Sequence, residues 1–150
     1  MKQHDECREW LESYGELKVE AARLKKRHER LFTQATQITT HLSNEPKGGN
    51  GDKEKLLAML ADADEEALRK YASAERRMRE IEEFIDSLPT GEGRMILRLR
   101  YVELLRWKNV KRALAKSGLY YEEAQIYRFH GVGLREAREE WKRRKGVHNE

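Results

Sequence analysis

The side chains with the clearest chemical potential in this 150-residue chain are basic groups near its C-terminal end. Residues 94–145 contain 15 Lys and Arg against 6 Asp and Glu, a net charge of +9, whereas residues 1–51 sum to +1 and residues 52–93 to −5. Proteins that bind nucleic acid gather positive charge on one module in this way. The charge distribution therefore favours a nucleic-acid contact within residues 94–145.

Eight residues of this stretch have side chains suited to contacts with a DNA duplex. Gln pairs with adenine and Arg with guanine in bidentate geometry, and a Tyr ring packs on a thymine methyl or reaches a phosphate. Lys and Arg on a neighbouring helix neutralise backbone phosphates. We expect base contacts from Tyr121, Gln125 and Arg128, and phosphate contacts from Lys108, Lys111, Arg112, Lys116 and Arg135.

The sequence around these residues predicts a helix-turn-helix module over residues 91–150. A helix re-enters near Glu92, a short amphipathic helix spans 107–116, Ser117 and Gly118 form a break, and a long helical pattern covers 121–144. The inward stripe of the long helix has spacings of four, four, three and four: Ile126, His130, Leu134, Ala137 and Trp141. We expect the N-terminal end of this helix to enter a major groove.

Residues 1–90 predict an antiparallel coiled-coil hairpin of two helices, with its loop at residues 43–52. Two seams of alternating three- and four-residue spacing support it: Trp10, Tyr14, Leu17, Ala21, Leu24, His28, Leu31, Ala35, Ile38 and Leu42, then Leu57, Leu60, Asp64, Ala67, Tyr71, Ala74, Met78, Ile81, Ile85 and Leu88. Paired residue numbers sum to 98 or 99, so one register satisfies all ten layers. The register sets His28 against Tyr71, for a shared hydrogen bond, and leaves Asp64 as a misfit beside Ala35. Pairing of the seams between chains, or a homodimer through the leftover face, stays open.

The composition indicates an all-α protein without a sheet, because long alternating β-branched runs are missing. One cysteine, Cys7, excludes an internal disulfide and fits the reducing cytoplasm. No apolar run approaches the ~20 residues that cross a bilayer, so no membrane partner is expected. The sequence has no phosphate-binding Gly-rich loop, nucleophile elbow or paired catalytic carboxylates, so we expect no enzyme, no cofactor and no metal.

A family resemblance adds to this reading. It is carried by Arg100-Tyr101-Val102-Glu103, then Trp107, Val110 and Leu114, and then the run Tyr121-x-Glu123-x-Gln125-Ile126-Tyr127-Arg128-Phe129-His130 with Leu134. These residues resemble the C-terminal signature of short phage and prophage regulators, which are similar to region 4 of sigma-70 factors and akin to the late-gene activators RinA and ArpU. The chain departs from the family in two places. Its short second helix reads Val110-Lys111 where the family usually has Ile-Ala, and its turn is longer and lacks a capping Ser directly before the last helix. The resemblance implies double-stranded DNA binding at phage promoters and a contact with host RNA polymerase.

Three functions follow as hypotheses. The first is a DNA-binding transcriptional regulator. The second is an adaptor that docks on RNA polymerase or a sigma factor without reading DNA. The third is a DNA-packaging recognition subunit, which would normally form rings.

Overall fold

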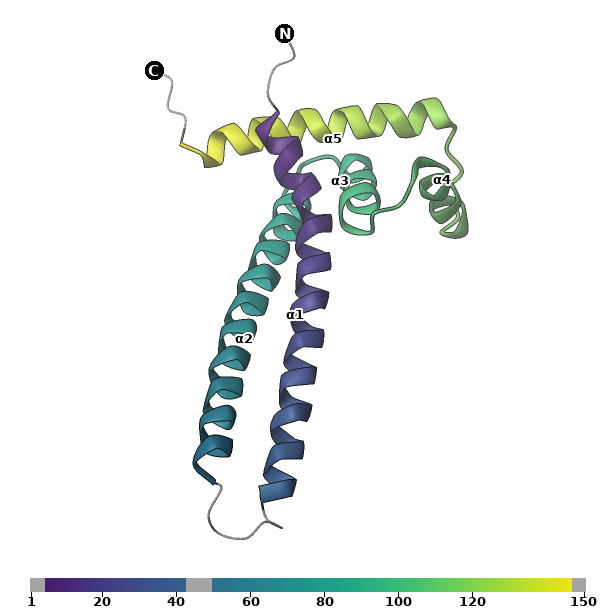
Figure 1. Ribbon diagram of the computed structural model, residues 1–150. Helices are drawn as coiled ribbons and strands as arrows, with labels where there is room; N and C mark the ends of the chain where they lie inside the picture. The colour runs from purple at the N-terminus through teal and green to yellow at the C-terminus, as the bar shows by residue number, and fades with distance from the viewer. Residues whose placement is uncertain (1–4, 43–49, 147–150) are drawn as a thin grey trace. The chain divides into compact units, whose positions relative to one another are not determined.

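The computed structural model describes residues 5–42 and 50–146, and every regular element among them is helical (Figure 1). The elements are α1 (Glu6–Leu42), α2 (Asn50–Asp86), α3 (Gly91–Leu97), the π-helical turn η1 (Arg98–Val102), α4 (Trp107–Lys116) and α5 (Glu123–Arg144). The all-α prediction is therefore confirmed for this part of the chain. Most of the predicted loop at 43–52 lies outside the described residues, and α2 already begins at Asn50.

The chain divides into two compact units, one of Leu17–Arg76 and one of Met1–Glu16 with Arg77–Glu150. Helices α1 and α2 each contribute to both. We call Leu17–Arg76 the hairpin unit and the other the C-terminal unit. The domain boundary predicted at residue 90 stays a prediction, since these units are defined by contacts in space.

In the hairpin unit, residues 17–42 of α1 and 50–76 of α2 run side by side in opposite directions (Figure 1). The predicted seam contributes all four buried hydrophobic residues described in this unit: Ala21, Leu24, Ala67 and Ala74. Three of the four are alanine, which lets two helices approach closely. The predicted bond between His28 and Tyr71 is wrong, because His28 Nδ1 is hydrogen-bonded to Asp64 Oδ1. Asp64 is thus no misfit. Its partner His28 lies seven residues, about two helical turns, from Ala35, which the predicted register set beside it, so the two seams pair in a shifted register.

In the C-terminal unit, the ends of α1 and α2 build an aromatic cluster with α5. The Trp10 ring lies 5.0 Å from Phe84 and 5.1 Å from Trp141, measured between centroids. Phe84 and Leu11 are fully buried, although neither belongs to the predicted seams. A seam between two helices needs one apolar stripe, and packing α5 against the same helices needs a second.

Two glycines set the crossing of α3 and α5. A Cβ at Gly93 would lie 3.0 Å from Gly133 Cα, and one at Gly133 would lie 3.0 Å from the Gly93 carbonyl oxygen. A side chain at either position would meet backbone, which cannot swing aside. The pair therefore allows α3 to pack directly on α5, which fixes the long helix over the module.

A strained turn leads from η1 to α4. Leu104 has a φ of +60°, in the left-handed region that bulky residues rarely adopt. Its Cδ2 atom would lie 3.4 Å from a Cβ at position 15. Gly15 lowers the helix propensity of α1, but it lies where α1 contacts the Leu104 side chain.

Candidate nucleic-acid interface

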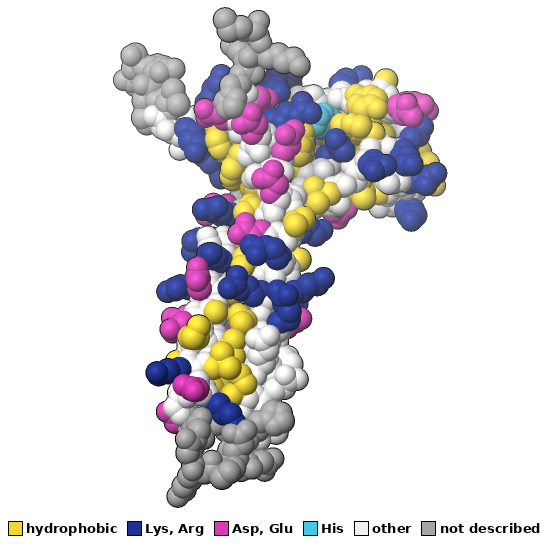
Figure 2. Space-filling model, viewed as in Figure 1, with side chains coloured by type: hydrophobic (Ala, Val, Ile, Leu, Met, Phe, Trp, Pro, Cys, Tyr) yellow, Lys and Arg dark blue, Asp and Glu magenta, His cyan; other side chains and the backbone are white. Residues whose placement is uncertain are grey.

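Helix α4 places its four predicted phosphate-binding residues on the outside. Val110 and Leu114 are buried in a cluster with Ile96 and Ile126. This burial turns the rest of the helix to solvent, and the exposed residues are Lys108, Lys111, Arg112 and Lys116. The structure therefore brings these four cations together on one short helix. Figure 2 shows part of the surface of this unit, with dark blue Lys and Arg side chains gathered on it.

A six-residue turn joins α4 to α5. Gly118 has a φ of +82°, which favours glycine and ends α4 sharply. Gln125 Oε1 then accepts the backbone N–H of Glu122 at 3.0 Å, as part of a capping box that starts α5. This box takes the place of the capping Ser that the sequence lacks. It also explains why α5 begins at Glu123 and not at Tyr121, where the predicted helical pattern began.

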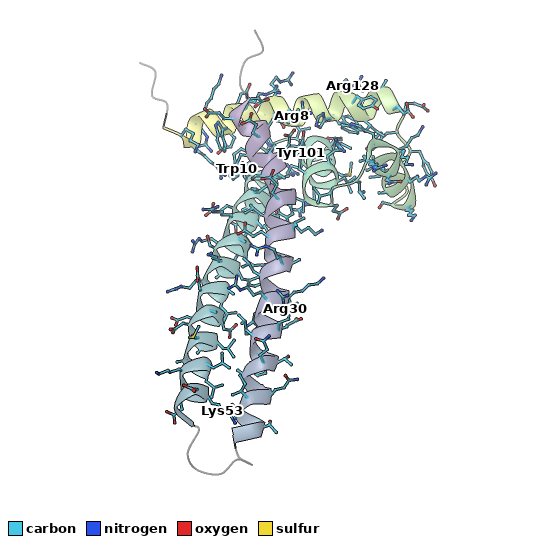
Figure 3. All side chains as sticks on the ribbon, in the orientation of Figure 1. Arg8, Trp10, Arg30, Lys53, Tyr101 and Arg128 are labelled. Carbon is cyan, nitrogen blue, oxygen red and sulfur yellow. The ribbon has the colours of Figure 1, made fainter. Side chains whose placement is uncertain are left out.

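The three predicted base-contact residues lie in different surroundings. Tyr121 is half-buried against the core cluster, and its ring meets Phe129 edge to face at 5.1 Å. Gln125 is half-buried, and its carbonyl oxygen is engaged in the cap. Arg128 is exposed, in the N-terminal half of α5, with its guanidinium 5.8 Å from the Phe129 ring centroid (Figure 3). Of the trio, only Arg128 is exposed, and the base-reading role of all three stays a prediction.

The exposed side of α5 contains residues that sequence reasoning did not assign to contacts. Its first four turns expose Glu123, Ala124, Tyr127, Arg128, Gly131 and Arg135. Steps of four, three and four link Ala124, Arg128, Gly131 and Arg135, which places them on one face. The helical spacing in the sequence could have predicted this face, since these positions fall between the residues of the inward stripe, such as Ile126 and Leu134. Arg135, predicted as a phosphate contact, lies on this face.

Two exposed tyrosines flank the basic residues. Tyr127 is 50% exposed, and its ring lies 4.9 Å from Trp107, at a steep angle. Tyr120, in the turn before α5, is 83% exposed. A hollow of about 210 Å³ lies between α4 and α5, lined by Trp107, Lys108, Lys111, Glu123, Ile126 and Tyr127. The outer surface of α4 and α5 thus combines cations with aromatic rings, a combination used to contact phosphates and stack on bases.

A buried tyrosine and a half-buried histidine support this surface from behind. Tyr101 Oη lies 3.0 Å from His130 Nε2 (Tyr101 is labelled in Figure 3). Burial of the imidazole, together with the nearby Arg8 and Arg100 guanidinium groups, lowers the pKa of His130 to about 4. The ring is therefore neutral at pH 7, and a hydrogen bond joins it to the tyrosine hydroxyl. His130 belongs to the predicted inward stripe of α5, and its ring is bonded there to a hydroxyl group.

Several arginines that contribute to the +9 charge of residues 94–145 have partners inside the protein. Arg98 pairs with Asp86, and Arg94 donates to the Leu88 carbonyl. Arg138 forms an ion pair with Asp5 at 2.7 Å. At the end of α5, Arg144 lies 4.9 Å from the Phe84 ring centroid. These contacts stabilise the unit, so the +9 charge overstates how many cations are available to a ligand.

Comparison with protein-family models, curated protein sequences and solved structures finds no match to this chain. Among the described helices, none has the length and apolar character to span a bilayer. In the same part of the chain, no group of three or more His, Cys, Asp or Glu is placed to hold a metal ion. The residues of α4 and α5 are therefore what indicates a function for this chain.

Proposed function

We propose that the chain is a DNA-binding transcriptional regulator, in which α4 and α5 act as a helix-turn-helix. The observation that carries the proposal is the outer surface of this helix pair. It exposes Lys108, Lys111, Arg112 and Lys116 on α4 and Arg128 and Arg135 on α5. In such a module the second helix enters the major groove, while the preceding helix contacts the backbone.

The side chains of the two helices suit different contacts with DNA. The α4 cations suit phosphates, which give affinity without sequence information. Arg128 lies one helical turn beyond the start of α5, where side chains of a recognition helix meet base edges. Its guanidinium suits the O6 and N7 acceptors of guanine. Tyr127 and Ala124 on the same exposed side offer apolar contacts for a thymine methyl.

The proposal is tested by two single substitutions with opposite signatures. Duplexes bound by the full chain are enriched from a randomised library, and affinities are measured by fluorescence anisotropy at one fixed salt concentration. Arg128→Ala should lower affinity for the enriched duplex by about 1–3 kcal/mol and change affinity for random duplex little. Lys111→Ala should weaken both duplexes alike. Equal losses on both duplexes for Arg128→Ala would remove Arg128 from base reading, and the absence of any duplex binding would end the proposal.

A second function, docking on RNA polymerase or a sigma factor without DNA, has one observation in its favour. Tyr120 and Tyr127 are exposed aromatic residues, and tyrosine is enriched at protein interfaces. Capture of purified polymerase by the chain in nuclease-treated buffer separates this function from the first. Retention there, combined with no shift of any duplex in a gel, would favour the adaptor.

A further inference from the structure

The far part of the hairpin unit leaves an apolar surface without a partner. Among the described side chains of residues 28–40 and 51–66, none is fully buried. The seam residues Leu31, Ile38, Leu57 and Leu60 stay half exposed, although their spacing marks them as core positions. Two helices alone therefore do not close this seam.

Helix α2 is apolar on all sides in this region. Residues 56–61 read Leu-Leu-Ala-Met-Leu-Ala, nearly two full turns without a polar side chain. Leu56 is 43% and Met59 is 68% exposed, on a helix that packs against α1 on one side only. A helix that is hydrophobic all round is normally buried on more than one face. This segment thus lacks at least one neighbouring helix.

Helix α1 is uncharged in the same region. In a chain with 39% charged residues, residues 31–40 contain no Asp, Glu, Lys or Arg. The hydroxyls of Thr33, Thr36, Thr39 and Thr40 donate to carbonyls one turn earlier, at 2.8–2.9 Å. A hydroxyl bonded to its own helix needs no water, so these residues can be covered at low cost. Phe32, 63% exposed, lies within this segment.

We propose that residues 31–40 and 56–61, the hairpin patch, form a homodimer interface in which two hairpins make a four-helix bundle. A lack of charged residues, together with exposed Phe and Met side chains, is typical of the core of a protein interface. In Figure 2, yellow side chains gather between the two helices of this region on the face shown. A second hairpin supplies two further helices with the same seam, which is what a half-closed bundle needs.

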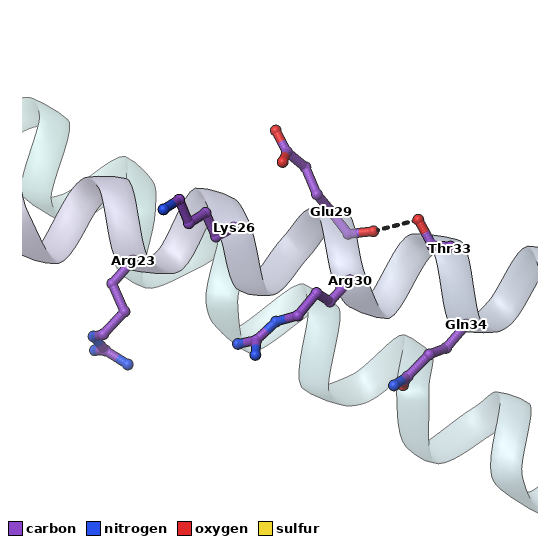
Figure 4. Close-up of a pocket in the computed structure, with 6 residues that line it drawn as sticks. All are labelled: Arg23, Lys26, Glu29, Arg30, Thr33 and Gln34. Atoms are coloured by element: carbon purple, nitrogen blue, oxygen red, sulfur yellow. Dashed lines mark hydrogen bonds between the residues drawn. The ribbon is translucent and has the colours of Figure 1, made fainter.

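Charge complementarity identifies the occupant as a second copy. Residues 23–30 of α1 carry five Lys and Arg and one Glu, while residues 62–66 of α2 carry four acidic side chains. Arg23, Lys26 and Arg30 line an open groove of about 530 Å³ with Glu29, Thr33 and Gln34 (Figure 4). The two segments lie side by side in one hairpin, since His28 of the basic segment is bonded to Asp64 of the acidic one. In a two-fold dimer of hairpins stacked face to face and running in the same direction, α1 of each copy faces α2 of the other, so the basic groove meets the acidic segment. Stacked hairpins that run in opposite directions set α1 against α1 and like charges together, which is unfavourable.

The mass of the full chain in solution tests this inference. Sedimentation velocity at about 50 μM should give twice the 17.8 kDa of one chain. Phe32→Glu with Met59→Glu should raise the dissociation constant at least about tenfold, because two charges would be buried at the interface. Val19→Glu is the matched control, since Val19 is 70% exposed in the same unit but outside the hairpin patch. It should leave the dimer intact.

A charge swap distinguishes a second copy from any other partner. Lys26→Glu with Arg30→Glu, and Asp62→Lys with Glu65→Lys, should each weaken self-association, whereas an equimolar mixture of the two variants should recover it. Far-UV circular dichroism verifies that each variant is helical. A wild-type mass of one chain or of more than two, or a mixture that stays dissociated, would overturn the proposal. The outcome is independent of DNA binding, which is measured separately.

Discussion

The two units of this protein use the same kind of helix in different ways. Of the twenty buried hydrophobic residues described, sixteen lie in the C-terminal unit and four in the hairpin unit. The first unit packs parts of α1 and α2 against α3, α4 and α5, whereas the second has two helices only. The difference shows that regular apolar spacing along two helices does not by itself produce a buried core, because burial on several sides requires several elements. We infer that the core of the C-terminal unit is complete, whereas the hairpin unit needs a second hairpin to bury its apolar side chains.

Removing one aromatic ring from each unit should give the largest difference in the free energy of unfolding. Phe84 is 1% exposed and lies between Trp10 and Trp141, so Phe84→Ala should lower the free energy of unfolding by about 3–5 kcal/mol. Phe32→Ala should have an effect that grows with protein concentration, because this ring is exposed in a single chain and covered in the proposed dimer. Denaturant unfolding at 1 and 100 μM measures both. Equal, concentration-independent losses would contradict the contrast.

The glycines of α5 should separate packing from helix propensity. A Cβ at Gly133 meets backbone at 3.0 Å, whereas one at Gly131 meets nothing within 4 Å. Gly133→Ala should therefore destabilise the C-terminal unit by about 1–3 kcal/mol through forced separation of α3 and α5. Gly131→Ala should stabilise it by up to about 1 kcal/mol. Thermal unfolding of the two variants gives the sign directly, and a stabilising Gly133→Ala would show that the two helices do not cross so closely.

Acidification should weaken the C-terminal unit through His130. Its pKa is about 4 in the folded protein, lowered by burial of the ring and by Arg8, Arg100 and Arg138, against 6.5 when unperturbed. Between these values the unfolded chain binds more protons, so stability falls as the pH drops from about 6.5 to 4 and is unaffected by this residue above that range. For a half-buried ring the loss should be on the order of 2 kcal/mol.

Urea unfolding at pH 7, 5.5 and 4.5 measures this loss. His130→Gln removes the imidazole, so its stability should fall less steeply over the same range. Parallel pH profiles for the variant and the wild type would show that His130 does not cause the loss.

Much of the hairpin could be predicted because its pattern repeats. Leu24 and Ala74 recur at coiled-coil spacing, and both are buried as that spacing predicts. Leu11 and Phe84 could not be predicted in this way, because their burial depends on α5, which is distant in sequence. The pairing of His28 with Asp64 could not be predicted, because two seams with the same three- and four-residue spacing also fit each other when shifted by one heptad.

The candidate site was predictable where amphipathicity sets direction. Lys108, Lys111, Arg112 and Lys116 face outward because Val110 and Leu114 point into the core. Tyr121 was less predictable because the capping box delays the start of α5 by two residues, which leaves its ring against Phe129. Local hydrogen bonding at a helix start overrides a periodic pattern there.

The salt dependence of duplex DNA binding tests the central proposal, the role of the α4 cations, most directly. The logarithm of the binding constant of the full chain should fall linearly with the logarithm of the salt concentration between 50 and 200 mM, a range in which phosphate contacts dominate. Lys111→Ala should reduce the magnitude of that slope by about 0.9, the contribution of one phosphate contact, and Lys18→Ala in the hairpin unit should leave it unchanged. A slope unaffected by Lys111→Ala, or equally affected by both variants, would contradict the account.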